Sequence, residues 1–309
     1  MSLRRRSALV LVPLVCAAAL AGCGGDSTPA ATASPSASSS AGVAVKGAFG
    51  EKPTLTVPAT AAPKALTTDV LTAGSGATAA KGDLVVVNYL GQTWEPKEGK
   101  PNVFDNSFDK KKAFGFPLGG GQVIKGWDQA LEGKKVGSRV LLTIPPELAY
   151  GAEKNAQNAL GGQTLLFVVD LVGTIGKDAS AKGSAVTPSV AGLPKVTSES
   201  GKKPAVASVA GIAVPAKPVS GLLLKGDGEK IDPTKTLAMQ IVQTDTATGK
   251  QTQETWGKGL TSAPAETVLG TVSALQGATI GSRAVVVTPK GATDGSPSAV
   301  LVVDVVGQF

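Results

Sequence analysis

The sequence contains no histidine and only two cysteines among its 309 residues. Without histidine, Ser/His/Asp triads, Cys/His nucleophile pairs and histidine-ligated metal sites are excluded. Histidine is also the side chain whose charge ordinarily changes near neutral pH. Any catalysis must therefore proceed without a base that titrates in that range.

Both cysteines lie near the N-terminus, in a stretch with the features of an export signal. A basic start precedes an apolar run over residues 8–22 that is shorter than the roughly 20 residues of a membrane-spanning helix, which predicts a signal peptide at 1–22. The ending LAGC resembles the lipobox of bacterial lipoproteins, in which Cys23 receives lipid. An ordinary cleavage site with a chance cysteine is the alternative. Since Cys16 lies in the removed segment, a lipidated Cys23 leaves no disulfide.

A lipid on Cys23 would hold a soluble protein at a membrane surface. We therefore expect localisation at the cell membrane, lipid-anchored on its extracytoplasmic face. Residues 24–42 contain no aromatic or large apolar side chain, so residues 23–42 are expected to form a disordered tether.

The charge pattern does not indicate a nucleic-acid surface. The formal net charge is +7, and Lys110–Lys112 form the only basic triplet after the leader. No aromatic side chains for base stacking interleave with this triplet. A solvated loop is the simpler interpretation, and no nucleic-acid partner is expected.

Two parts of the chain repeat each other. VGSRVLLTIP at 136 returns as IGSRAVVVTP at 280, and LLFVVDLVG at 165 returns as VLVVDVVG at 300. Several echoes in one order indicate a duplication, and two domains of about 100 residues or more have the usual size. The predicted domains are residues 43–176 and 200–309, joined by a linker of thin composition at 177–199.

Short β-branched runs bounded by glycine, proline or polar residues predict strands in each copy. One segment differs, because Ile124, Trp127 and Leu131 have the i, i+3, i+7 spacing of one helical face. A short helix among antiparallel strands must cover the apolar face of the sheet. The fold class is therefore expected to be α+β.

The first copy resembles the FKBP-type peptidyl-prolyl cis-trans isomerases. Five motifs carry the resemblance in order and spacing: GDLVVVNYLG, VFDNSF, FGFPLGGGQVIKGWDQALEGKKVGSR, LTIPPELAYG and QTLLFVVDL. The resemblance covers approximately residues 66–175 and implies an antiparallel half-barrel sheet wrapped on one short helix, and the internal repeat extends this fold to a second, degenerate domain. It also implies a monomer without a cofactor, whose partners are proline-containing unfolded or exported proteins, with macrolide inhibitors as further ligands.

The family resemblance assigns Trp127 to the floor of an aromatic pocket, Asp105 and Tyr150 to its polar rim, and the amide of Ile124 to a substrate carbonyl. Trp127 could instead be an ordinary core residue, and Asp105 could be a turn residue. The candidate walls are Tyr89, Phe104, Phe114, Val123, Ile124 and Phe167.

Two loops depart from the family pattern. The loop after Tyr150 usually carries an isoleucine-proline pair over the pocket, whereas here only Ala159 or Leu160 could take that place. The loop TWEPKEGKPNV is longer than in minimal members and is expected to shape the pocket rim through Trp94.

The second copy has lost the aromatic residues of the first. Of seven Phe, three Trp and two Tyr, only Trp256 and Phe309 follow Phe167. The aligned replacements are Ile241 for Tyr89, Thr271 for Trp127, Asp294 for Tyr150 and Leu301 for Phe167. This pattern predicts that the second copy keeps the fold and loses the site.

The sequence thus predicts a lipid-anchored prolyl isomerase that assists the folding of exported proteins. The alternative is a non-catalytic chaperone or interaction lipoprotein that binds proline-containing segments. The altered loop after Tyr150 favours the alternative. The joint presence of Trp127, Asp105 and Tyr150 favours the enzyme.

Overall fold

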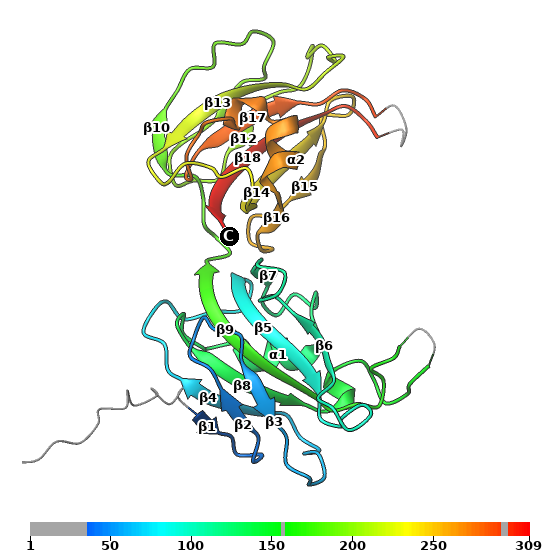
Figure 1. Cartoon of the computed structure of the whole chain (residues 1–309). Coiled ribbons are helices and arrows are strands. Elements are labelled where there is room, and N and C mark those ends of the chain that lie inside the picture. The colour runs from blue at the N-terminus through cyan, green and yellow to red at the C-terminus, as the bar shows by residue number, and fades with distance from the viewer. Residues whose placement is uncertain (1–35, 156–157, 292–295) are drawn as a thin grey trace, which may run out of the picture. The chain divides into compact units, whose positions relative to one another are not determined.

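The computed structural model describes residues 36–155, 158–291 and 296–309 (Figure 1). The predicted signal peptide, Cys23 and the tether as far as residue 35 lie outside these residues. Two large antiparallel sheets account for most strands, which agrees with the predicted α+β class. Within the described part of the chain, no helix is both long and apolar enough to cross a bilayer.

The first sheet is built from the N-terminal copy of the repeat. Its strands follow the order β4-β8-β9-β5-β6, and β7 pairs with the other end of β5. The elements are β4 (Thr67–Thr72), β5 (Leu84–Thr93), β6 (Val103–Asn106), β7 (Phe114–Pro117), the helix α1 (Lys125–Leu131), β8 (Arg139–Ile144), the 3-10 helix η1 (Pro146–Leu148) and β9 (Leu165–Ile175).

The second sheet repeats this strand order. It runs β13-β17-β18-β14-β15 with β16 on β14, and it gains one further strand, β10, beside β13. The elements are β10 (Gly183–Ala185), β13 (Val219–Gly226), β14 (Thr236–Asp245), β15 (Gln251–Glu254), β16 (Thr261–Pro264), the helix α2 (Ala265–Thr271), the 3-10 helix η2 (Ser273–Leu275), β17 (Arg283–Val287) and β18 (Ala299–Gln308).

Both faces of the first sheet are buried. Alternate residues of β5 such as Val85 and Val87 pack with α1, whereas Leu90 packs with the opposite core. A strand covered on both faces reads as a continuous apolar run, because successive side chains point to opposite faces. This explains why every residue of β8 is buried.

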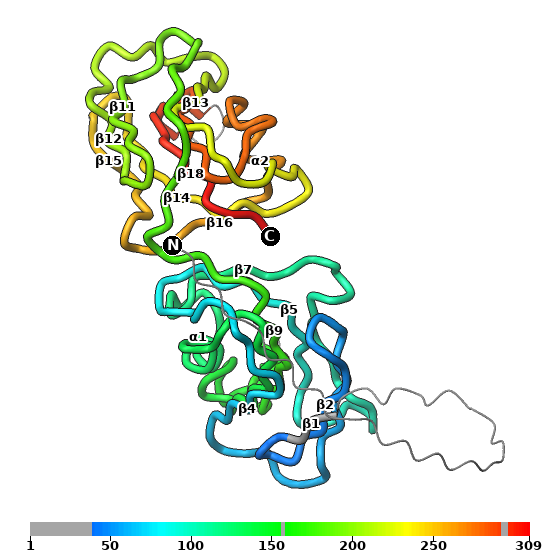
Figure 2. The backbone as a smooth tube through the Cα atoms, turned by 90° about the vertical axis from the view of Figure 1, so that its left-hand side faces the viewer, coloured from blue at the N-terminus to red at the C-terminus, as the bar shows by residue number. Residues whose placement is uncertain are grey.

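The face opposite the helix is covered in each sheet by small strands that precede it in the chain. In the first copy these are β1 (Ser36–Ser38), β2 (Ala44–Lys46) and β3 (Thr54–Thr56); in the second they are β11 (Val196–Thr197) and β12 (Ala205–Val206). Figure 2 shows β1 and β2 on the side of the first sheet away from α1. Val43, Val45 and Leu55 supply the apolar contacts there.

A buried ion pair joins each covering segment to its sheet. The Arg139 guanidinium donates to Asp170 at 2.6 and 2.7 Å and also to the carbonyls of Gly47 and Glu51, at 2.6 and 2.7 Å. Arg139 is 1% exposed and Asp170 is fully buried. The two charges thus neutralise each other, and the backbone carbonyls accept the remaining hydrogen bonds of the guanidinium.

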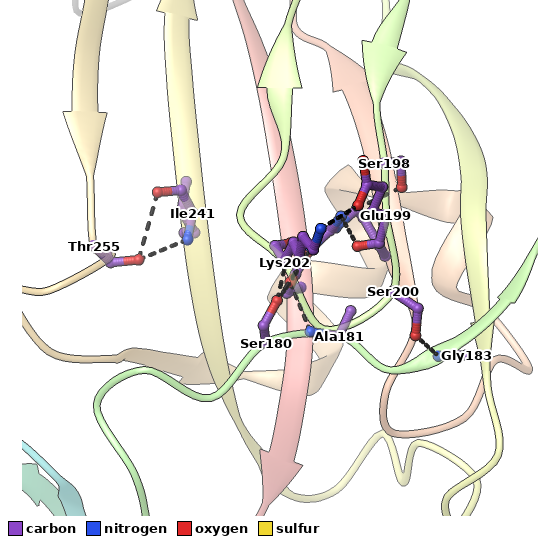
Figure 3. A network of polar contacts seen from close by, with 11 residues as sticks. Ser180, Ala181, Gly183, Ser198, Glu199, Ser200, Lys202, Ile241 and Thr255 are labelled. Carbon is purple, nitrogen blue, oxygen red and sulfur yellow. Dashed lines mark hydrogen bonds and ion pairs between the residues drawn. The ribbon is translucent and has the colours of Figure 1, made fainter.

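The second sheet repeats the pair with Arg283 and Asp304, both fully buried. Arg283 donates to the carbonyls of Glu199 and Lys202, and the amide of Ala181 donates to Asp304 at 2.7 Å (Figure 3). The repeated motifs contain both residues, but their pairing was not inferred from the sequence.

Two segments that the sequence assigned to connections contain strands. Residues 177–199, predicted to be a linker, contain β10 and β11, and Ala181 is fully buried. The end of the predicted tether also differs, because β1 pairs with β2. Composition alone did not predict these strands, because the segments have few large apolar side chains. Backbone hydrogen bonds order both segments, and contacts with Arg283 and Asp304 further order residues 177–199.

The helix is confirmed in the first copy, but the second copy places its helix one turn earlier. The repeat aligns α1 with residues 269–275, whereas α2 ends at Thr271 and is followed by η2. Pro117 and Leu131 are fourteen positions apart, and Pro264 and Leu275 are eleven apart. The shorter connection starts α2 directly after β16, so the loop over residues 118–124 has no counterpart.

Candidate active site

An aromatic cavity of about 650 Å³ lies on the α1 side of the first sheet. All nine residues that the sequence assigned to the pocket line it. They are Tyr89, Phe104, Asp105, Phe114, Val123, Ile124, Trp127, Tyr150 and Phe167. The fold brings together β5, β6, β7, β9, the N-terminal end of α1 and the segment after β8.

Trp127 lies at the centre of the aromatic cluster and is 4% exposed. Its ring meets Tyr89 at 5.3 Å and Phe167 at 5.1 Å between centroids, with interplanar angles of 81° and 88°. Edge-to-face contacts of this kind are favourable and fix the relative orientation of the rings. Phe116, 1% exposed, packs against Trp127 without lining the cavity.

A glycine makes room for the aromatic walls. A Cβ added to Gly91 would lie 2.6 Å from the ring of Phe167 and 2.9 Å from the ring of Phe104. These two rings meet edge to face at 5.6 Å. The backbone of β5 must therefore lack a side chain where the two rings approach it.

The carboxylate of Asp105 accepts two side-chain hydrogen bonds at the rim of the cavity. It accepts a hydrogen bond of 2.5 Å from the hydroxyl of Tyr89 and another of 2.5 Å from Lys110. Asp105 is thus more than a turn residue, and Lys110 is more than part of a solvated loop. The sequence signal for Lys110 was its place five residues after Asp105, across the turn that follows β6.

Both ionisable partners have shifted pKa values. Burial and the hydrogen bond to the Asp105 carboxylate raise the pKa of Tyr89. For Asp105, burial acts to raise the pKa, but the hydrogen bonds from Lys110 and Tyr89 outweigh it and the pKa lies below its ordinary value. Near neutral pH the pair is therefore a neutral phenol that donates to a carboxylate.

Backbone contacts set the loop that leads into α1. The Asp128 carboxylate accepts from the amides of Gly119 and Gly121, at 2.8 and 3.1 Å. This holds the glycine-rich loop against the first turn of α1 and places Val123 and Ile124 on the cavity. Among the described residues, the amide of Ile124 has no hydrogen-bond partner, so it remains available to an acceptor.

Other predictions about the rim had mixed outcomes. Tyr150 lines the cavity and is 47% exposed. Leu160 packs at the edge of the same core. Trp94 was expected at the rim, which is wrong: it is 3% exposed in the opposite core, where its indole donates to the carbonyl of Thr60 at 2.9 Å. Four further residues line the cavity and were not predicted from the sequence, namely Gly121, Gln122, Lys125 and Ala149.

The second sheet keeps the backbone frame of this site with different side chains. Tyr89 and Ser107 exchange backbone and hydroxyl hydrogen bonds, and Ile241 and Thr255 make the same pair (Figure 3). The buried core beside α2 contains no aromatic residue among those described. Asp294, the predicted counterpart of Tyr150, lies outside the described residues.

The region that forms most of the cavity matches a known protein family. The sequence profile of the FKBP-type peptidyl-prolyl cis-trans isomerases matches residues 76–172. A probable FK506-binding protein of Corynebacterium glutamicum is 42% identical over 122 residues, which are 40% of this chain and 98% of that protein. The chain belongs to the FKBP-type peptidyl-prolyl cis-trans isomerases.

Two further proteins are similar to part of this chain. The FK506-binding protein of Streptomyces anulatus is 40% identical over 40% of this chain and 96% of its own length. The crystal structure of AtFKBP13 is 34% identical over 37% of this chain and 96% of its own, with a TM-score of 0.31. From the family match and these sequence relatives, the protein is a peptidyl-prolyl cis-trans isomerase.

Proposed function

We propose that the isomerase reaction takes place in the aromatic cavity of the first sheet, with Trp127 as the floor against the proline ring. The observation that carries this proposal is the convergence of six aromatic or apolar walls around a buried indole, with one carboxylate at the rim. The amide of Ile124 is the donor for a substrate carbonyl, and Tyr150 closes the exposed side.

The chemistry requires a change of environment rather than a covalent step. Rotation about an X-Pro bond breaks amide resonance and costs about 18–20 kcal/mol in water. The twisted amide is less polarised than the planar one, so an apolar cavity favours the transition state over the ground state. A site without histidine is sufficient, because no proton has to be transferred.

We propose that Asp105 positions Tyr89 and Lys110 and presents one polar group beside the substrate. Because Tyr89 stays protonated, the hydroxyl is held in one orientation and its ring stays against Trp127. The role of Lys110 is to neutralise the carboxylate at the rim of the aromatic cavity.

The second copy is proposed to be a degenerate FKBP-like domain without isomerase activity. Its support is the shared strand order together with the lost loop and the lost aromatic residues. Thr271 in place of Trp127 removes most of roughly 150–250 Å² of aromatic contact area. We infer that this domain contributes through its surface rather than through a pocket.

The test is to separate the two copies and assay each on short X-Pro peptides. Residues 36–176 should retain essentially all activity of residues 36–309, and residues 177–309 should fold and have none. The fragments start at the first residue of β1 and at residue 177, so that each buried Arg–Asp pair stays with its partners. Peptide isomerisation by the second fragment, lost on mutation of Ile241 or Leu301, would overturn the assignment.

We further propose that the protein is exported and anchored through a lipid on Cys23. The support is the sequence alone: a basic and apolar leader that ends in LAGC. In cell fractions, Cys23→Ala should move the protein from the membrane to the soluble fraction. A wild-type protein without lipid mass at its N-terminus would contradict the proposal.

A macrolide of the kind named in the relatives is proposed to compete with substrate in this cavity. The relatives are called FK506-binding proteins, and a large apolar ligand suits the aromatic walls. The ligand should inhibit the peptide assay competitively. Tight binding that survives the double variant Trp127→Ala, Phe167→Ala would place the ligand elsewhere.

A further inference from the structure

A second cavity of about 710 Å³ lies on the opposite side of the first sheet from the aromatic cavity. Its walls come from two segments. Residues 55–61 comprise the end of β3 and the chain after it, and residues 92–101 comprise the end of β5 and its connection to β6. Trp94 forms part of the wall and holds the first segment through its hydrogen bond to the carbonyl of Thr60.

The side chain of Gln92 lines this cavity and is the feature that the fold does not explain. Gln92 is 2% exposed, and its side-chain amide makes no hydrogen bond with any described residue. The amide is not one of the fully buried groups that lack a partner, so its remaining exposure is to the cavity, where water or a ligand is its hydrogen-bond partner. In contrast, the amide of Gln240 in the second sheet, also fully buried, accepts a hydrogen bond from Thr255.

The other lining groups indicate which ligand would satisfy that amide. The walls include Pro58, Pro96, Pro101 and Trp94, and Glu95 is the one charged residue among the described residues that line the cavity. A primary amide both donates and accepts, which matches the adjacent N–H and C=O of a peptide backbone. This combination favours an uncharged or basic extended chain over an acidic ligand.

The end strand of the covering sheet supports the same occupant. β3 pairs only with β2 among the described residues, and its Leu55 and Thr56 line the cavity. An unpaired strand edge offers backbone donors and acceptors to an added strand. A peptide in this cavity would therefore find main-chain partners on β3 and a side-chain partner in Gln92.

We propose that this cavity is a second binding site, which takes an extended peptide segment and holds it through Gln92 and the edge of β3. The inference rests on the action of this protein on polypeptide substrates, but it does not require isomerisation. A client that occupies both cavities would be held on either side of one sheet, so the second site adds affinity for long chains and none for short ones.

The test is calorimetric titration of residues 36–309 with a proline-free hexapeptide of alternating valine and threonine, acetylated at its N-terminus and amidated at its C-terminus. The wild type should bind it, and a saturating X-Pro tetrapeptide should not displace it. Gln92→Leu should weaken binding roughly tenfold, since one hydrogen bond of about 1.4 kcal/mol corresponds to that factor.

A second variant keeps the proposal testable if Gln92→Leu fails to fold. Ala61→Trp fills the exposed mouth of the cavity and should abolish hexapeptide binding. Ala80→Trp, on an exposed alanine that lines neither cavity, is the matched control and should bind as the wild type does. Both should isomerise the X-Pro tetrapeptide at the wild-type rate, which separates this site from the proposed active site.

Three results would overturn the inference. The first is no hexapeptide binding by the wild type, and the second is binding that both Gln92→Leu and Ala61→Trp leave unchanged. The third is a wild-type dimer in sedimentation that Ala61→Trp converts to a monomer, which would make a second copy of the chain the occupant.

Discussion

The two sheets of this protein have one strand order and two different interiors. On the face away from the helix they are alike: each buries an arginine–aspartate pair that holds the preceding segment of chain. On the helix face they differ, because aromatic rings around Trp127 are replaced by aliphatic side chains around α2. The residues that hold the fold together and the residues that form the site therefore lie on opposite faces of the same strands.

Gly91 illustrates the difference at a single position. The rings of Phe104 and Phe167 press on it, so it cannot carry a side chain. The hydrogen bonds that equate Tyr89 with Ile241 place Gln243 at the corresponding position of β14. Leu301 is opposite Gln243, where the first copy has Phe167 opposite Gly91. The long side chain of Gln243 therefore fits at the position where the first copy needs a glycine.

The largest effect is expected from breaking the feature that the sheets share. Arg139→Leu or Arg283→Leu leaves Asp170 or Asp304 buried without its partner, which should lower the free energy of unfolding by about 3–5 kcal/mol. Urea denaturation of residues 36–176 and 177–309 checks this separately in each copy. A loss in only one fragment would show that the two pairs do not play the same role.

The next effect should separate the copies. Trp127→Thr gives the first copy the residue of the second and should reduce kcat/KM for X-Pro peptides by about 10- to 100-fold, because 1.4 kcal/mol of lost transition-state contact is one factor of ten. The reverse change, Thr271→Trp, should restore no activity to residues 177–309, since the loop over 118–124 is still missing.

Phe116→Leu is the control for this comparison. Phe116 packs against Trp127 but does not line the cavity, so this variant should lose stability and keep most of its kcat/KM. Equal losses of kcat/KM in both variants would mean that Trp127 acts through packing alone.

A smaller effect is expected at the rim. Asp105→Asn keeps the shape but weakens the acceptor for Tyr89 and removes the partner of Lys110, which should lower kcat/KM by roughly fivefold, as expected for about 1 kcal/mol. The equivalent change in the second copy, Gln253→Ala, should change neither activity nor stability measurably. Wild-type kcat/KM in Asp105→Asn would remove the carboxylate from the proposed site.

The smallest effect is the response to pH. The pKa of Asp105 lies below its value in the unfolded chain, so the stabilisation from this pair is present near neutrality and is lost as pH falls through the folded-state pKa. Since Tyr89 has a raised pKa and histidine is absent, kcat/KM should stay level from about pH 5 to 8. Lys110→Met should move the acid loss of activity to higher pH, and NMR titration of Asp105 measures the shift. A bell-shaped profile centred near neutrality would contradict this assignment.

The sequence by itself predicted the α+β class, the repeated motifs, the helix at Trp127 and nine of the thirteen residues that line the aromatic cavity. These follow from local patterns: β-branched runs, a helical spacing, and motifs whose residues stay close in the chain or match a family in order. Strand-forming and helix-forming signals are local, so they are readable without the fold.

Only the tertiary structure decided how distant residues meet. The pairing of Arg139 with Asp170 and the burial of Trp94 on the far face depend on strand register and on which segment covers which face. Thin composition at 177–199 predicted a linker, but long-range hydrogen bonds to Arg283 and Asp304 order it. The earlier start of α2 likewise depends on how three missing residues shorten a connection. No local pattern records such contacts, because their free energy arises between segments far apart in the chain.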